Sequence, residues 1–416
     1  MIFLPHCGHY LYNNKIYHKR EDAFDDMLIN KDYNNRIEFY YNDHVFQAID
    51  WTVPVQVSLD ELYKLRAKQL RDQYKYLVLL FSGGADSSQI LNTFLKHNIF
   101  IDEIICLHTE TLSNKLDYSN LDEEMKYYLE YELASKPLLK KVAELSPNTK
   151  ITAVDQTDFM VDSYVNKKYT HLGLEKGETA QVSIFTERGN TTIFNLLHYP
   201  ETYLKDSDNI GVIRGFEKPN LLVNKTELKF YFTDITLHQT KSIRKYNMNK
   251  ITFEDFYWSP NFPLIPIKQC QIIKELLETN YAFFNMFYTL QIAIRQHKNK
   301  TKYDQHLRLF NPSLILERKL VHIIYPDFNP NQFVAPKPRK VNMEVELINA
   351  TLQTNAVDVL SEYKKYVLKK YDKIVYKDQM REHILSRTYS LGKLNFKWKD
   401  TPNKERILEI LKSINE

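Results

Sequence analysis

Residues 76–88 read YLVLLFSGGADSS, and this stretch decides the fold. Its six leading apolar residues predict a strand buried on both faces, as in a parallel sheet covered by helices. The residues that follow, SSQILNTFLKH (87–97), predict a helix. Between strand and helix, Gly83 and Gly84 let the backbone pass close to an anion, and the N–H groups of the first helical turn point toward it. The stretch therefore predicts a phosphate-binding loop.

Polar groups around these glycines suit the phosphates of a nucleotide. Ser82, Ser87 and Ser88 add hydroxyl donors, and the backbone of Ala85 adds an amide. A carboxylate repels phosphate, so Asp86 is interpreted as a ligand of a Mg²⁺ ion that bridges to the phosphate oxygens. The loop lacks the GxxxxGK[ST] pattern of the Walker loop and the GxGxxG pattern of dinucleotide-binding folds. A turn that merely caps a helix is the alternative.

Further apolar runs alternate with helical patterns along the middle of the chain. They predict three more strands and a closing hairpin, in the order IDEIICLHTE (101–110), KITAVD (150–155), NIGVIRG (209–215) and LLVNKTELKFYFTD (221–234). The stretch EEMKYYLEYELASKPLLKKVAEL (123–145) predicts a long helix that Pro137 kinks or splits. This order predicts an α/β fold with a parallel sheet in residues 58–235.

The flanking parts have other patterns. Residues 1–57 are expected to be a small β-rich part, because IEFYYNDHVFQAIDW (37–51) reads as a hairpin that turns at Asn-Asp. Ser58 with Glu61 is a capping-box pattern ahead of a helix. Residues 236–416 are expected to be a mostly helical substrate or partner domain. Its two long periodic segments are joined by a linker or surface loop, YPDFNPNQFVAPKPRK (325–340).

Composition is that of a globular protein in a reducing compartment. Hydrophobic residues make up 43% and charged residues 26% of the chain, which excludes global disorder. We recognise no transmembrane run and no signal sequence, so we expect a cytoplasmic protein without a membrane partner. Cys7, Cys106 and Cys270 lie too far apart for a CxxC zinc or redox motif. The net charge of +4 does not by itself indicate nucleic-acid binding.

SGGADSS after a buried strand resembles the PP-loop of the N-type ATP pyrophosphatases, a superfamily that includes asparagine synthetase, GMP synthetase and NAD synthetase. A closer resemblance is to bacteriophage-encoded proteins labelled asparagine synthase-like or adenine nucleotide α-hydrolase-like. It is carried by DQYKYLVLLFSGGADSS (72–88), GVIRGFEKPNL (211–221) and FYWSPNFPLIPIKQ (256–269). The resemblance implies a five-stranded parallel sheet of the adenine-nucleotide α-hydrolase-like (HUP) kind, with ATP and Mg²⁺ as cofactors. It also implies that an acceptor oxygen attacks the α-phosphorus, pyrophosphate leaves, and a nucleophile then displaces AMP.

The chain departs from two branches of that superfamily. Class II amidotransferases carry a cysteine nucleophile at position 2, where this chain has Ile2, so residues 1–57 are not expected to be that glutaminase. Thiolating enzymes rely on a catalytic cysteine pair or a cluster motif, whereas Cys106 and Cys270 are interpreted as buried core residues. Ammonia, or another nucleophile, would then come from solution or from a partner.

A second group of candidate residues ends the strand after the loop. Ligands of open α/β sheets bind at the carboxyl ends of the strands, near the point where the strand order reverses. Leu107, His108 and Thr109 lie at such an end, where backbone groups near Leu107 would read adenine. An ordinary loop with a single histidine is the alternative.

A third group follows the strand that ends near Gly215. Asparagine synthetase has a glycine-rich loop with an acidic pair at the comparable strand end; Gly215 and Glu217 are similar, but the acidic pair is absent. Lys218 is interpreted as a catalytic cation that stabilises the departing pyrophosphate. In FYWSPNFP (256–263) the aromatic residues are interpreted as a hydrophobic plug that docks the helical part on the sheet, and an aromatic ligand shelf is the alternative. Lys268 is interpreted as a further catalytic cation. For Lys218, a surface lysine in a turn is the alternative.

These residues predict an AMP-forming, ATP-dependent ligase or amidotransferase-like enzyme, in which Asp86 holds the metal and a small molecule is the acceptor. One alternative is an enzyme that adenylates a tRNA or DNA base. The basic runs at 297–308 and 337–340 would then contact nucleic acid, although a solvated surface explains them more simply. The other is a phage protein that binds ATP without turnover in the host cytoplasm. Neither the acceptor nor the oligomeric state follows from the sequence.

Overall fold

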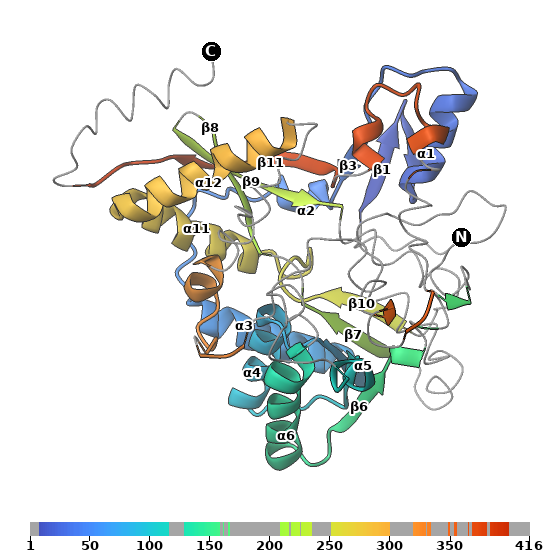
Figure 1. Cartoon of the computed structure of the whole chain (residues 1–416). Helices are drawn as coiled ribbons and strands as arrows, with labels where there is room; N and C mark the ends of the chain where they lie inside the picture. The colour runs from blue at the N-terminus through green and yellow to red at the C-terminus, as the bar shows by residue number, and fades with distance from the viewer. Residues whose placement is uncertain are drawn as a thin grey trace.

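A five-stranded, all-parallel sheet lies at the centre of the molecule (Figure 1). In spatial order its strands are β10 (Ile251–Asp255), β7 (Ile210–Arg214), β4 (Tyr76–Phe81), β5 (Glu103–His108) and β6 (Lys150–Asp155). The computed structural model describes residues 8–115, 129–158, 209–215, 218–224, 226–234, 251–299, 319–329, 331–333, 368–380 and 383–398, with a few isolated positions between them. The expected α/β class with a parallel sheet is confirmed.

Strand β10 is the one strand of this sheet that the sequence pattern did not predict. It pairs in parallel with β7, so the sheet takes its fifth strand from beyond residue 235, where the α/β part was expected to end. Two of its five residues are acidic, which hides the strand pattern. Both are buried in ion pairs: Glu254 lies 2.7 Å from an Arg66 nitrogen and Asp255 lies 2.8 Å from an Arg214 nitrogen.

The strand order reverses at β4. The next two strands in the chain, β5 and β6, lie on one side of β4, and the two later strands, β7 and β10, lie on the other. The loops after β4 and β7 therefore face one another at the carboxyl edge of the sheet, where such sheets bind ligands. Their approach is close: a Cβ on Gly215, just after β7, would lie 3.1 Å from the backbone nitrogen of Ser87.

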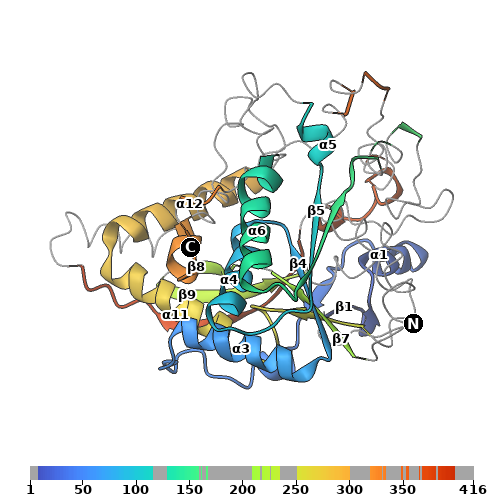
Figure 2. The same ribbon diagram turned by 90° about the horizontal axis from the view of Figure 1, so that it is seen from below.

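Helices α3 (Leu59–Gln73), α4 (Ala85–Lys96) and α6 (Lys136–Leu145) lie on one side of the sheet (Figure 2). Ser58 is confirmed as the N-cap of α3, because its hydroxyl accepts a hydrogen bond of 3.2 Å from the Glu61 amide, while the Glu61 carboxylate pairs with Lys64. The long helix expected around Pro137 does not run as a single α-helix: a π-helical turn at Tyr131–Ser135 leads directly into α6, and the proline lies in the first turn of α6. A short helix, α5 (Glu110–Ser113), follows β5.

The N-terminal part contains a three-stranded antiparallel sheet of order β2-β1-β3. The hairpin expected at Asn42 is wrong: that residue adopts a φ of 49° and begins the short helix α2 (Asp43–Phe46). The hairpin turn lies instead at Asn13 and Asn14, whose φ values of 48° and 61° suit a two-residue hairpin turn. The elements of this part are β1 (His9–Tyr12), β2 (Lys15–Tyr17), α1 (Arg20–Ile29) and β3 (Glu38–Tyr40).

A third, antiparallel sheet contains the expected hairpin and one strand from the C-terminal part. Its strands are β8 (Asn220–Asn224), β9 (Glu227–Thr233) and β11 (Leu385–Lys393). Between β10 and β11 lie the helices α11 (Leu264–Thr279) and α12 (Tyr281–Asn299) and a 3₁₀ turn, Lys377–Met380. The C-terminal part thus supplies two strands as well as helices, while most of its second periodic segment lies outside the described residues. None of the described helices is long and apolar enough to cross a membrane.

Candidate functional site

Residues 82–84 connect the end of β4 to the first turn of α4. Gly83 has a φ of +82°, and a Cβ on it would lie 2.2 Å from the hydroxyl oxygen of Ser135 in the π turn. Gly84 is the N-cap of α4, and a Cβ there would meet only two side-chain oxygens, at 3.3 and 3.5 Å. The loop therefore requires glycine at 83 for its shape, whereas space remains beside the backbone at 84.

The first turn of α4 directs its amides toward this loop. The first intrahelical bond runs from the Ser88 amide to the Gly84 carbonyl, at 3.0 Å. The amides of residues 85–87 precede that bond, and such first-turn amides have no partner inside their helix. Together with the partial positive charge of a helix N-terminus, they can hold an anion.

The serine hydroxyls are partly used to hold the loop in shape. The Ser87 hydroxyl donates to the Gly84 carbonyl at 3.2 Å and lies 3.3 Å from the Ser82 hydroxyl. The Ser88 hydroxyl donates to the Gly83 carbonyl at 3.1 Å, and Ser88 is only 1% exposed. Ser82 is exposed, so of the three predicted hydroxyl donors it is the one most open to a ligand.

Asp86 is the centre of a cluster on the same turn. The Lys218 ammonium, on the segment after β7, lies 2.7 Å from Oδ2 of Asp86, and Lys218 is 7% exposed. The Tyr325 hydroxyl donates to Oδ1 of the same carboxylate. The Tyr257 hydroxyl donates to the backbone carbonyl of Asp86 at 2.8 Å. The structure thus joins two predicted site residues, Asp86 and Lys218, as an ion pair.

The two tyrosines of this cluster were not predicted from the sequence as contacts of Asp86. Their rings stack with centroids 5.3 Å apart. Burial, followed by the charge of Asp86, raises the pKa of Tyr325 well above its ordinary value, so its hydroxyl remains a donor. Phe256, Tyr257 and Trp258 are each fully buried, as the hydrophobic-plug interpretation predicts, and they leave no ring surface for a ligand shelf.

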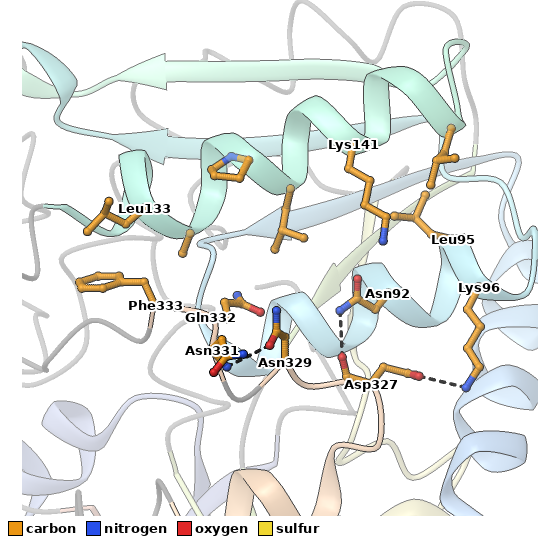
Figure 3. Close-up of a pocket in the computed structure, with 14 residues that line it drawn as sticks. Asn92, Leu95, Lys96, Leu133, Lys141, Asp327, Asn329, Asn331, Gln332 and Phe333 are labelled. Atoms are coloured by element: carbon orange, nitrogen blue, oxygen red, sulfur yellow. Dashed lines mark hydrogen bonds and ion pairs between the residues drawn. The ribbon is translucent and has the colours of Figure 1, made fainter.

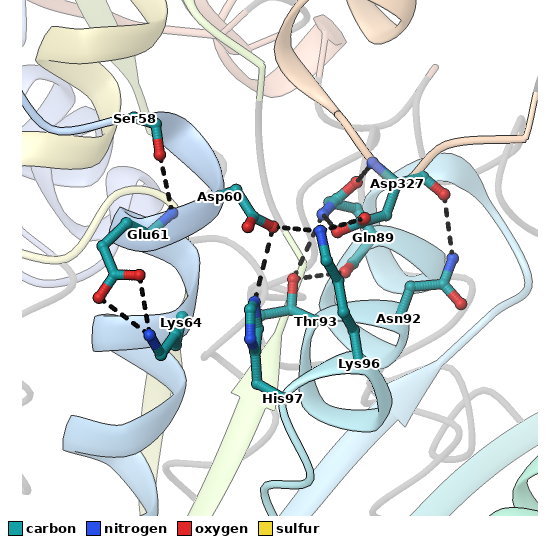
Figure 4. A network of polar contacts seen from close by, with 10 residues as sticks. All are labelled: Ser58, Asp60, Glu61, Lys64, Gln89, Asn92, Thr93, Lys96, His97 and Asp327. Carbon is teal, nitrogen blue, oxygen red and sulfur yellow. Dashed lines mark hydrogen bonds and ion pairs between the residues drawn. The ribbon is translucent and has the colours of Figure 1, made fainter.

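The Pro-rich connection packs on α4, in its described residues 325–329 and 331–333, instead of projecting as a linker. The Gln332 side-chain amide donates to the Gly83 carbonyl at 3.0 Å and to the Ser88 hydroxyl at 2.9 Å. Asp327 accepts a bond of 3.0 Å from the Gln89 amide and pairs with Lys96 at 2.9 Å (Figure 4). A segment distant in sequence therefore supports the loop from its outer side.

The end of β5 carries the second predicted group. His108 stacks on Tyr131 with ring centroids 3.9 Å apart, and its Nδ1 accepts a bond of 3.2 Å from the Glu110 amide. That bond assigns the proton of the neutral ring to Nε2. Burial lowers the pKa of His108, which keeps the ring neutral near pH 7. Leu107 is half-buried inside β5 and Thr109 begins α5, so neither places a side chain clearly in a site.

Asp155, at the end of the neighbouring strand β6, was missed by the sequence interpretation. It is paired in register with His108, and its carboxylate accepts the Thr111 amide at 2.7 Å and the Thr157 amide at 2.9 Å. Burial raises the pKa of Asp155, but the hydrogen bonds from Thr157 and Thr111 outweigh burial and hold the pKa below its ordinary value. The sequence feature that could have identified Asp155 is its position at the carboxyl end of a parallel strand, where such sheets bind ligands.

Lys268 is not among the residues that contact Asp86 in the described part of the chain. Its ammonium donates to the Val55 carbonyl at 2.7 Å, a contact with the chain ahead of α3. Gly215 packs against the first turn of α4, while Glu217 lies outside the described residues. Cys106 and Cys270 are both free and buried, as expected of core residues.

Within the described part of the chain, no group of three or more His, Cys, Asp or Glu side chains could hold a metal ion. Residues 300–308 and 337–340, which hold most of the two basic runs, lie outside that part. Compared with protein-family models and with curated proteins, the chain matches none.

Proposed function

We propose that this protein is an ATP pyrophosphatase that forms AMP and activates an acceptor for displacement by a nucleophile. The observation that carries the proposal is the phosphate-binding loop at the reversal point of the parallel sheet, with Gly83 at positive φ and the amides of residues 85–87 directed at the loop. Backbone amides at a helix N-terminus suit an anion, and a loop with space at Gly84 suits a phosphate chain.

Each part of the site has a role in this proposal. The loop and first-turn amides would hold the phosphates of ATP, with Ser82 and Ser87 as hydroxyl donors. The end of β5 would hold adenine, where the stacked pair of His108 and Tyr131 adds flat, neutral ring surface. Lys218, 2.7 Å from Asp86, would stabilise charge on the leaving pyrophosphate. Catalysis would then rest on positioning and electrostatics, with no covalent enzyme intermediate.

Magnesium fits this arrangement only after a rearrangement. Mg²⁺ is usually bound by one or two carboxylates together with the substrate phosphates. Both oxygens of Asp86 are already engaged, one by Lys218 and the other by Tyr325. Asp86 would become a metal ligand only when Lys218 leaves its carboxylate, and the freed ammonium would then be available to the phosphates.

The finer fold assignment belongs to the same proposal. The strand order β10-β7-β4-β5-β6, with the loop on the central strand, supports a sheet of the adenine-nucleotide α-hydrolase-like kind. A small-molecule acceptor in the cytoplasm is the favoured substrate. One observation favours a second candidate, a protein that binds ATP without turnover: Lys218 neutralises Asp86, the residue expected to hold the metal.

The experiment uses ATP labelled at its α-phosphate, offered with Mg²⁺ and pools of candidate carboxylate, amide or nucleic-acid acceptors. Label in AMP supports the proposal, and label in ADP overturns it. Binding without AMP from any pool favours the second candidate. Binding itself is measured as the rise in melting temperature with Mg²⁺ and ATP.

The control for binding is Gly84→Val, because a branched side chain at 84 blocks the approach of a phosphate. The nearest atom to a Cβ at 84 is the hydroxyl oxygen of the exposed Ser82 side chain, at 3.3 Å, which can rotate away, so an unliganded melting temperature near that of the wild type is expected. The ATP-dependent rise should disappear. If ATP still raises the melting temperature of the folded variant, residues 82–88 are not the phosphate-binding loop.

A further inference from the structure

A cleft of about 580 Å³ opens between α4 on one side and the π turn with α6 on the other (Figure 3). The segment of residues 327–329 and 331–333 also lines it. Its α6 side is mainly apolar. Leu133, on the π turn, and Leu145, the last residue of α6, are 52% and 61% exposed, and Pro137 and Leu138 lie between them in sequence. Within α6, spacings of four residues place 137, 141 and 145 on one face, and Leu133 of the π turn lines the same cleft. Large apolar side chains left in water along one stripe indicate a surface that binds something.

The opposite side of the cleft is a row of carboxamides. Asn92 comes from α4, and Asn329, Asn331 and Gln332 come from the segment that packs on it. The Asn92 amide nitrogen donates to the Asp327 carbonyl at 3.3 Å, and that of Gln332 donates to the phosphate loop. These bonds hold the side chains of Asn92 and Gln332 in place through their amide nitrogens, so their side-chain carbonyl oxygens can accept hydrogen bonds from a ligand. Such a row can bond the free N–H and C=O groups of another chain.

Charge adds a third feature. Lys141 of α6 projects toward the cleft in Figure 3, and within the described residues it forms no ion pair. Lys96, on the other side, already pairs with Asp60 at 2.6 Å and with Asp327 at 2.9 Å. The cleft therefore presents one cation that is not neutralised, near the middle of its apolar side.

We propose that this cleft binds an extended peptide segment of a partner protein, with apolar side chains on either side of an acidic residue. The carboxamide row favours an extended segment over a helix, because a helix uses its main-chain groups internally and a strand does not. Leu133 of the π turn and Leu138 and Leu145 of α6 contact the apolar side chains, and Lys141 pairs with the acidic one. This inference is independent of the proposed ATP chemistry.

The test uses fluorescein-labelled hexapeptide pools, acetylated and amidated at their ends, without nucleotide. The third residue is Asp, Asn or Lys, and the other positions are mixtures of Leu, Ile, Val, Ser and Thr. By fluorescence anisotropy, the wild-type protein should bind the Asp pool about three- to ten-fold more tightly than the Lys pool, as expected for one exposed ion pair against one repulsion. Lys141→Glu should reverse this preference.

Lys140→Glu is the matched control, because Lys140 is an exposed neighbour on the same helix that does not line the cleft. It should keep the wild-type preference, and equal melting temperatures would show that both variants fold. The proposal fails if no pool binds, if Lys141→Glu keeps the preference, or if Lys140→Glu changes it equally. Light scattering of the wild type and of the double variant Leu133→Lys, Leu145→Lys tests a further outcome. A wild-type dimer that becomes a monomer in the double variant would assign the cleft to a second copy of this chain and would also overturn the proposal.

Discussion

The ammonium of Lys218 lies 2.7 Å from the carboxylate of Asp86, and this ion pair joins the two loops that meet where the strand order reverses. Lys218 follows β7 and Asp86 lies on the first turn of α4, so 132 positions of sequence separate them. Both side chains are largely shielded, which strengthens their attraction relative to a surface pair. Their meeting brings the segment after β7 beside the first turn of α4.

Lys218→Met should lower kcat for AMP formation by about 10²–10³-fold, the usual effect of removing one electrostatic stabiliser. Negative charge grows on pyrophosphate as its bond to the α-phosphorus breaks, so the lysine acts more strongly in the transition state than in the ground state. Initial rates and ATP titrations measure the two effects separately. A folded variant with the wild-type rate, or with only weaker ATP binding, would make Lys218 a structural or ground-state contact.

Tyr325→Phe and Tyr257→Phe form a matched pair. Each removes one buried hydroxyl donor to Asp86, so each should lower the free energy of unfolding by about 1 kcal/mol. Only Tyr325 bonds the carboxylate, so only Tyr325→Phe should change the Mg²⁺ concentration needed for half-maximal ATP binding. Fluorescence titrations with ATP at several Mg²⁺ concentrations measure this. Equal Mg²⁺ dependence in both variants would mean that Tyr325 does not orient that carboxylate.

Gly83→Ala should destabilise the protein more than Gly392→Ala. Both glycines have positive φ, +82° and +81°, so alanine introduces backbone strain of about 1 kcal/mol at either position. At Gly83 the new Cβ would also lie 2.2 Å from the Ser135 hydroxyl oxygen, whereas at Gly392 its nearest contact is a methyl carbon of Thr52 at 3.5 Å. Urea unfolding should show a larger loss of unfolding free energy for Gly83→Ala than for Gly392→Ala. Equal losses would mean that Ser135 and the π turn move aside at little energetic cost.

His108 should make the protein less stable in mild acid. Burial places its pKa below the ordinary value of 6.5, so just below pH 6.5 the unfolded chain binds a proton that the folded chain does not. Stability therefore falls as the pH drops through this window. His108→Gln removes the titrating group, and its free energy of unfolding should fall less than that of the wild type between about pH 7.5 and about pH 5. Parallel curves would contradict the shift.

Cys106 and Cys270 should not react with a thiol reagent in the native protein. Both side chains are fully buried, and burial raises the pKa of Cys106 to about 12. Because the thiolate is the reactive form, native Cys106→Ala and Cys270→Ala should release as much colour from Ellman's reagent as the wild type does. In denaturant each variant should show one thiol fewer. Rapid native labelling at either position would revive the thiol-transfer chemistry that the sequence interpretation set aside.

Local sequence alone determined the elements with strong, contiguous signals. The apolar run of β4, the double glycine and the helix after it predicted the loop, because backbone freedom and helix amides act within a few residues. The N-cap at Ser58 and the change of helix type ahead of Pro137 were equally local. The hairpin predicted at Asn42 is wrong because an asparagine suits both a hairpin turn and the start of a helix. Only the packing of the surrounding chain selects between the two.

Tertiary structure decided which residues surround the loop. β10 carries two acids that a sequence pattern reads as surface, and only their burial against Arg66 and Arg214 makes them part of a sheet. Tyr325 and Gln332 reach the loop from a Pro-rich stretch that shows no periodic pattern. Contacts across hundreds of residues depend on how the elements pack, because side chains distant in sequence meet only when the sheet and its helices are assembled. The conformation of residues 82–88 is therefore a local property, and the set of side chains around Asp86 is a property of the whole fold.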